Sequence, residues 1–169
     1  MCKACDDGIA GLDDPVRIQQ WDDQEQAWLR ETIREHGWAI QAVEAEPARH
    51  QPPFAYTIGL TRYGHAELLV FGLGHREAAQ VLNALGRRAR SGLPIASGSL
   101  FAPGAAGPRA LRAAEVPNPG SVLFGAVRRY GPRVSALQIL VADDSGTFPG
   151  EPGYRDAEWL QPAPGSFAA

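Results

Sequence analysis

The sequence predicts an α+β fold in which a mainly antiparallel sheet packs against about three helices in a single domain. Two observations lead to this prediction. Helical and strand-like segments succeed one another in the order α-β-β-β-α-β-α-β, so three strands follow one another without an intervening helix. In addition, 44% of the 169 residues are hydrophobic, which is enough for one core at a length typical of one domain.

The first helix is expected to begin at Asp22, which can cap it, with Glu25 completing a capping box. The residues of its apolar stripe are Trp28, Leu29, Thr32, Ile33 and His36. Gly37 then ends the helix in a left-handed conformation. Strands are expected over residues 38–43, 54–60 and 67–73. The near-continuous apolar run of the last of these strands indicates burial on both faces.

The second half of the chain is expected to contain two more helices and two more strands. A helix over residues 76–90 has an inner face made of Ala78, Val81, Leu82, Leu85 and Ala89. The stretch over residues 95–108 is rich in Gly, Ala, Ser and Pro and is expected to form an exposed loop or flap. Asn118 and Pro119 predict the start of a third helix, which ends at Tyr130. The remaining strands are expected over residues 111–116 and 134–142.

We expect three parts along the chain. They are an N-terminal arm over residues 1–20, which carries a Cys-x-x-Cys motif, an α+β domain over residues 21–162, and a flexible tail over residues 163–169. A net charge of −3 argues against nucleic acid as the main partner. No stretch approaches the ~20 consecutive apolar residues of a membrane span, and the first residues lack the apolar core of a secretory signal. We therefore expect a cytoplasmic protein without a membrane partner.

The only two cysteines, Cys2 and Cys5, are separated by two residues. Two thiolates at this spacing can both reach one Zn²⁺ ion at ~2.3 Å. In a cytoplasmic protein, paired cysteines are more often metal-binding or redox-active than a static disulfide. Redox use is less favoured, because no strand precedes Cys2 to form a thioredoxin-like unit. The alternative is a terminal segment whose thiols have no role.

The cysteine pair supplies half of a tetrahedral zinc site. The missing ligands could come from His36, from Asp6, or from the same pair in a second subunit, which would make a homodimer. We favour His36, because it lies at the predicted end of the first helix, where a folded-back arm can reach it. The alternative role of His36 is structural, since a protonated histidine in the last helical turn interacts favourably with the helix macrodipole.

A second candidate site lies at the end of the strand over residues 54–60. Tyr56, Arg62 and His65, together with Tyr63, are expected to form a ligand-binding site there, because polar groups at strand ends often line pockets. The alternative is an ordinary surface turn.

Two further groups of charged residues have competing interpretations. A group of three arginines could bind an anion or could complement the dipole at a helix C-terminus: Arg87, Arg88 and Arg90. The segment Asp143-Asp144-Ser145-Gly146 is predicted to be a turn, because it lacks the alternating oxygen ligands and the closing glutamate of a calcium loop.

Several short segments are specific when they are taken together. They are Cys2-x-x-Cys5-Asp6, His36-Gly37-Trp38-Ala39-Ile40-Gln41, Tyr56-Thr57-Ile58-Gly59-Leu60, Glu67-Leu68, Gln138 to Asp143, and Phe148-Pro149. This set resembles the domain-of-unknown-function family 4262, an uncharacterised bacterial group, from the first residues to about Gln161. The resemblance implies that the cysteine pair and His36 belong to one recurring set, and it implies no activity.

We interpret the chain as a small cytoplasmic domain that binds an unknown small molecule or protein and carries a structural Zn²⁺ site at Cys2, Cys5 and His36. One alternative is a metal-dependent enzyme with an open zinc position and with Tyr56 and His65 in the adjacent pocket. Another is an interaction module of an immunity or regulatory type without metal. The sequence contains no Gly-x-Ser-x-Gly, phosphate-binding glycine loop or His-Glu-x-x-His motif, which weakens the case for an enzyme.

Overall fold

The computed structural model describes residues 14–166. They belong to two compact units, one ending at Gly37 and one beginning at Trp38, which are described separately. The α-helices are α2 (Pro15–His36), α3 (His75–Arg90) and α4 (Phe124–Tyr130). The strands are β1 (Ala39–Val43), β2 (Phe54–Ile58), β3 (Glu67–Phe71), β4 (Leu100–Phe101), β5 (Leu111–Glu115) and β6 (Ala136–Val141). Short 3₁₀ helices are formed by Pro47–Arg49, Leu60–Tyr63, Pro119–Ser121, Gly131–Arg133 and Glu158–Leu160.

Helix α2 forms the described part of the first unit. The carboxylate of Asp14 accepts a hydrogen bond of 3.0 Å from the backbone N–H of Val16, and Pro15 occupies the first turn. At the other end Gly37 has a φ of 95°, and its N–H donates to the carbonyl of Ile33. The predicted C-terminus is confirmed, but the predicted start at Asp22 is wrong. The helix begins at Pro15, because Asp14 and Pro15 are themselves a cap and a first-turn proline.

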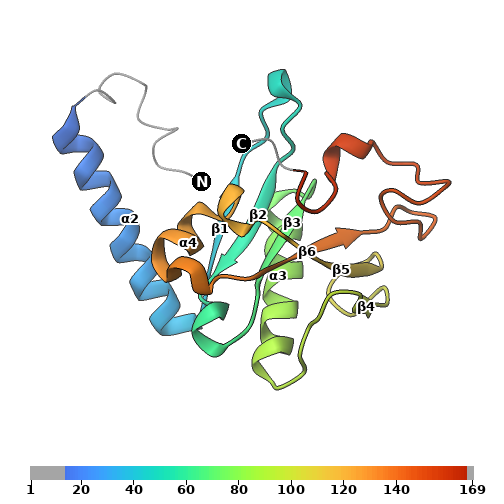
Figure 1. Ribbon diagram of the computed structural model, residues 1–169, viewed down its shortest axis with the longest axis horizontal. Coiled ribbons are helices and arrows are strands. Elements are labelled where there is room, and N and C mark those ends of the chain that lie inside the picture. Colours follow the sequence, from blue (N-terminus) through green and yellow to red (C-terminus); the bar gives the residue numbers. More distant parts are fainter. Residues whose placement is uncertain (1–13, 167–169) are drawn as a thin grey trace. The chain divides into compact units, whose positions relative to one another are not determined.

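The second unit contains a six-stranded sheet with the order β1-β2-β3-β6-β5-β4 (Figure 1). Neighbouring strands are antiparallel, except that β3 and β6 are parallel. The connection from β3 to β6 contains α3, the β4–β5 pair and α4, which is the long crossover that a parallel pair requires. The predicted α+β class with a mainly antiparallel sheet is confirmed.

The side chains of β2 alternate between the two faces of the sheet. Ala55 belongs to a hydrophobic cluster with Val81 and Leu82 of α3. The neighbouring Tyr56 accepts a hydrogen bond of 3.1 Å from the backbone N–H of Gly125 in α4. Helices α3 and α4 therefore contact opposite faces of β2 (Figure 1). Every residue of β3 is buried, which confirms the burial predicted for that strand.

Two of the remaining predictions need correction. Asn118 and Pro119 begin a 3₁₀ turn rather than the third α-helix, which begins at Phe124. Val122 interrupts the helical path, because its φ of −140° is far from the value of about −63° in an α-helix. The expected loop over residues 95–108 contains the short edge strand β4, which pairs with β5. By contrast, α3 agrees with its prediction, and its five expected inner residues are buried.

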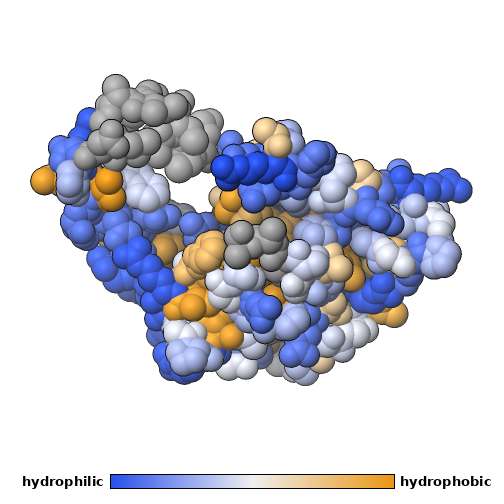
Figure 2. Space-filling view, turned by 45° about the horizontal axis from the view of Figure 1, so that its top comes forward, coloured by the Kyte–Doolittle hydropathy of each residue, from blue (hydrophilic) through white to orange (hydrophobic). Residues whose placement is uncertain are grey.

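The surface of the described residues is mixed in character. Figure 2 shows hydrophobic residues in small groups separated by hydrophilic ones on the face that it draws. The most exposed large hydrophobic residues of the second unit are Leu100 and Phe124. Among the helices of the described residues, none is long and apolar enough to cross a membrane.

Candidate functional site

A pocket of about 470 Å³ lies at the edge of the sheet where the parallel strands β3 and β6 end. At these strand ends the pocket is bordered by the first turn of α3, which follows β3, by the turn after β6, and by the residues before β5. The pocket is lined by Glu77, Pro103, Pro108, Arg109, Ala110, Asp143, Asp144 and Gly146. The carboxyl ends of parallel strands are a frequent location for ligand sites in α/β sheets. We call the pocket described here the Arg109 pocket.

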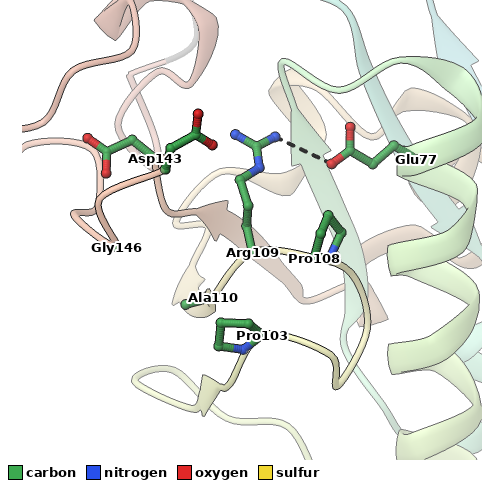
Figure 3. A pocket seen from close by; sticks show the side chains of 8 residues that line it. Glu77, Pro103, Pro108, Arg109, Ala110, Asp143 and Gly146 are labelled. Carbon is green, nitrogen blue, oxygen red and sulfur yellow. Dashed lines mark hydrogen bonds and ion pairs between the residues drawn. The ribbon is translucent and has the colours of Figure 1, made fainter.

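Arg109 is the cation of this pocket. Figure 3 shows its side chain reaching between Glu77 on α3 and the turn that carries Asp143. One terminal nitrogen lies 3.4 Å from a carboxylate oxygen of Glu77, and the other lies 3.4 Å from Asp156 and 3.5 Å from the carbonyl of Ala142. All three contacts are long for charge-assisted hydrogen bonds. Arg109 is therefore neutralised by two carboxylates without a tight bidentate pair.

The turn after β6 is organised by Asp143, which is buried. Its Oδ1 accepts hydrogen bonds from the hydroxyl and the N–H of Ser145 and from the N–H of Thr147, and its Oδ2 accepts one from the N–H of Arg155. These donors, the Ser145 hydroxyl first, lower the pKa of Asp143 from 3.8 to about 2. The predicted turn at this position is confirmed, and its carboxylate is used to hold the turn.

Asp144 differs from its neighbour. It is exposed and lines the same pocket. Within residues 14–166 its carboxylate has no hydrogen-bond or ion-pair partner. The pocket thus combines three carboxylates with one guanidinium group, and one of these carboxylates is available to a ligand.

The turn between β2 and β3 is built around Glu67, which is fully buried. Its Oε1 accepts hydrogen bonds from the N–H of Gly59 (2.9 Å) and from the N–H (2.9 Å) and hydroxyl (2.8 Å) of Thr61. Its Oε2 accepts bonds from the Thr57 hydroxyl (2.6 Å) and the N–H of Leu60 (3.3 Å). Five donors from three backbone positions and two side chains converge on one carboxylate, which fixes the 3₁₀ helix Leu60–Tyr63.

The structure separates the ligand-binding residues predicted near this turn. Tyr56 is 2% exposed, and its hydroxyl donates to Oε1 of Gln41 at 3.0 Å on the α4 face. Arg62 and Tyr63 are exposed on the turn, and His65 is half-buried. The guanidinium of Arg62 lies 5.8 Å from the centre of the Tyr63 ring. Tyr56 therefore has a structural role within the core, whereas Arg62 and Tyr63 are accessible.

The predicted zinc ligands Cys2 and Cys5 lie outside the described residues. His36 is at the last position of α2, and its side chain is 70% exposed, with Nε2 3.8 Å from a carboxylate oxygen of Glu35. Within residues 14–166, no three histidine, cysteine, aspartate or glutamate residues are grouped so that they could hold a metal ion.

A family model described as Domain of unknown function (DUF4262) matches residues 32–155. The chain belongs to this family. The match contains the whole sheet and all residues that line the Arg109 pocket, and it confirms the resemblance noted in the sequence. Comparison with curated proteins and with solved structures gave no match.

The pocket of this DUF4262 domain was not predicted from the sequence. The sequence indicates only that Glu77 is an acidic residue in the first turn of a helix, where its charge interacts favourably with the helix dipole. The sequence predicts Asp143 only as part of a turn. The sequence gives one indication of Arg109, because it is the first charged residue after the uncharged stretch over residues 91–108 and lies two residues before β5.

Proposed function

We propose that this DUF4262 domain binds a small organic cation, such as an amine or a guanidine, in the Arg109 pocket. The observation that carries the proposal is the unpaired carboxylate of Asp144 in a pocket whose single cation is already neutralised. Arg109 is shared between Glu77 and Asp156, so the charge of Asp144 and that of Asp143 are not compensated within the pocket. A ligand with one positive charge would compensate part of this negative charge.

The shape and the apolar part of the lining support the same class of ligand. A volume of about 470 Å³ falls within the range of small-molecule sites. Pro103, Pro108 and Ala110 supply apolar surface next to the carboxylates. This combination suits an alkyl chain that ends in an ammonium or guanidinium group, because the chain can cover the prolines while the charged end meets Asp144.

The proposal is tested by titrating the ¹⁵N-labelled protein with butylamine, agmatine and the neutral control butanol, with binding followed by amide shifts. We expect saturable shifts of residues 143–146 with the two cations and none with butanol. Asp144→Asn should weaken binding about tenfold, whereas the matched control Glu115→Gln, at the opposite end of β5, should leave it unchanged. Equal binding by the Asp144→Asn variant, or by butanol, would contradict the proposal.

We also propose that Cys2 and Cys5 bind Zn²⁺, with His36 as the third ligand. The Cys-x-x-Cys spacing supports this proposal, and so does the exposure of the His36 imidazole at the end of α2. Such a site would tie the N-terminal residues to this helix and couple metal binding to stability.

Metal content measured by elemental mass spectrometry tests the zinc site. We expect about one zinc per chain, lost in a Cys2→Ser/Cys5→Ser variant, reduced in His36→Gln and retained in the control His50→Gln. Half a zinc per chain would instead indicate a four-cysteine site shared by two subunits. Protein that contains no zinc when purified anaerobically would refute the site.

A further inference from the structure

Two arginine side chains from different elements lie next to one aromatic ring. Arg62 and Tyr63 belong to the 3₁₀ helix Leu60–Tyr63, and Arg90 is the last residue of α3. The guanidinium carbon of Arg90 lies 4.6 Å from the centre of the Tyr63 ring, and that of Arg62 lies 5.8 Å from it. Both distances are within the ~6 Å of cation–π contacts. We call Arg62, Tyr63, Arg87 and Arg90 the Tyr63 cluster.

Among the described residues, the arginines of the Tyr63 cluster have no carboxylate as an ion-pair partner. Arg87 is exposed three residues before Arg90, on the same side of α3, and adds a third guanidinium group. The helix dipole accounts for arginines in the last turn of α3 but not for Arg62, which comes from a different element.

The positions of Arg62 and Tyr63 are fixed by hydrogen bonds between their 3₁₀ helix and the core. The backbone N–H groups of Leu60 and Thr61 donate to the buried carboxylate of Glu67, and Gly64 ends the short helix with a φ of 76°. The guanidinium carbon of Arg90 also lies 6.0 Å from the centre of the Trp38 ring. A guanidinium group that is stacked on a ring keeps its N–H donors directed outward, so little conformational freedom remains to be lost on binding.

We propose that the Tyr63 cluster binds a phosphate monoester. Guanidinium groups match phosphate oxygens in a bidentate fashion, and a phosphate dianion compensates more of the charge of three arginines than a carboxylate does. This site is independent of the Arg109 pocket, because Arg90 and Glu77 lie at opposite ends of α3, about 20 Å apart along the helix. The phosphate could belong to a small phosphorylated molecule or to a phosphorylated protein side chain, and both present the same group to the arginines.

The test uses phenyl phosphate as the probe, with arginine Nε–H signals and backbone amide shifts recorded by NMR at low ionic strength. We expect saturable shifts at Arg62, Arg90 and residues 61–65, and weaker binding as salt is added. Benzoate, which carries a carboxylate on the same ring, should bind at least about tenfold more weakly. A phosphotyrosine peptide with neutral flanking residues is compared with phenyl phosphate, and tighter binding of the peptide would identify a protein as the source of the phosphate.

Variants separate the cluster from a general effect of positive charge. Arg62→Gln and Arg90→Gln should each weaken phenyl phosphate binding about tenfold. Arg76→Gln, which removes an exposed arginine from the first turn of the same helix, should not change it. Tyr63→Phe keeps the ring and should bind normally, whereas Tyr63→Ala should bind more weakly. Unchanged binding in the Arg62 and Arg90 variants, equal losses in Arg76→Gln, or equal affinity for benzoate would overturn the proposal.

Discussion

Replacement of Glu67 by glutamine tests whether one buried carboxylate holds the turn between β2 and β3. In the native protein, three donors face Oε1 and two face Oε2. Glutamine retains one oxygen, which can accept the three bonds made by Oε1. Its amide nitrogen then replaces Oε2 and faces the N–H of Leu60. Since both groups are donors, the N–H of Leu60 loses its hydrogen bond. The Thr57 hydroxyl can rotate to accept from the amide and so keep one contact.

The size of the effect follows from these contacts. An unpaired buried N–H costs about 1–3 kcal/mol, and here it belongs to Leu60. The three remaining bonds to oxygen change from charged to neutral acceptors, and each loses up to about 1 kcal/mol. The two contributions sum to about 1–6 kcal/mol, and we expect Glu67→Gln to lower the free energy of unfolding by about 3–4 kcal/mol, the middle of this range. This is a large part of the ~5–15 kcal/mol that typically stabilises a domain.

Urea denaturation, followed by circular dichroism and tryptophan fluorescence, measures this change as a lower midpoint at an unchanged m-value. Hydrogen exchange should also become faster at the amides of residues 59–61. Thr61→Val, which removes only one donor from Oε1, should lose about 1–2 kcal/mol, and the exposed control Glu115→Gln should lose almost nothing. A Glu67→Gln variant within about 1 kcal/mol of the native protein would refute the view that this carboxylate organises the turn.

Three further changes have defined outcomes. The pKa of Asp143 is held at about 2 instead of 3.8, so its carboxylate contributes stability above pH 3.8 that is lost as the pH falls through 2. The melting temperature of Asp143→Asn should therefore change less than that of the native protein between about pH 4 and about pH 2. Melting curves of the two proteins that shift in parallel with pH would contradict this. Gly125→Ala places a Cβ 2.5 Å from Oε1 of Gln41 and 2.9 Å from Cδ1 of Ile58, and should cost about 1–3 kcal/mol in urea denaturation; a neutral result would show that the α4 face adapts freely. Tyr56→Phe leaves the Gly125 N–H without its acceptor and should cost about 1–2 kcal/mol by the same measurement, and no loss would mean that water replaces the hydroxyl.

The elements that were predicted correctly are those whose pattern is local. Helix α3 has apolar residues at helical spacing on one face, and β3 is a continuous apolar run, so neither depends on distant residues to be recognised. The starts of α2 and of α4 were misplaced for a local reason as well. The region of α2 contains two candidate starts, and Asp14-Pro15 is used rather than Asp22. In the region of α4, Asn118-Pro119 makes only a 3₁₀ turn, and the helix begins at Phe124 without a side-chain cap.

The candidate sites depend on contacts between distant parts of the sequence. Arg109, Glu77 and Asp156 meet because β5, α3 and the segment after β6 converge at one edge of the sheet. All three residues can be read from the sequence, but their proximity follows from the strand order and register of the folded sheet. Likewise, Glu67 reads as one polar residue in an apolar strand until the turn folds over its carboxylate. Arg62 and Arg90 were predicted as members of two separate groups, and the structure shows that both lie next to the Tyr63 ring.

The parallel pairing of β3 with β6 also bears on how the chain folds. Strands β1, β2 and β3 form one antiparallel group, and β4, β5 and β6 form another. Among the strands that the structure describes, the two groups are joined by the pairing of residues 67–69 in β3 with residues 136–138 in β6. Closing this long loop costs chain entropy before any inter-strand contact compensates for it. The two groups can form from nearer contacts, so the seam between β3 and β6 is the step expected to limit the folding rate.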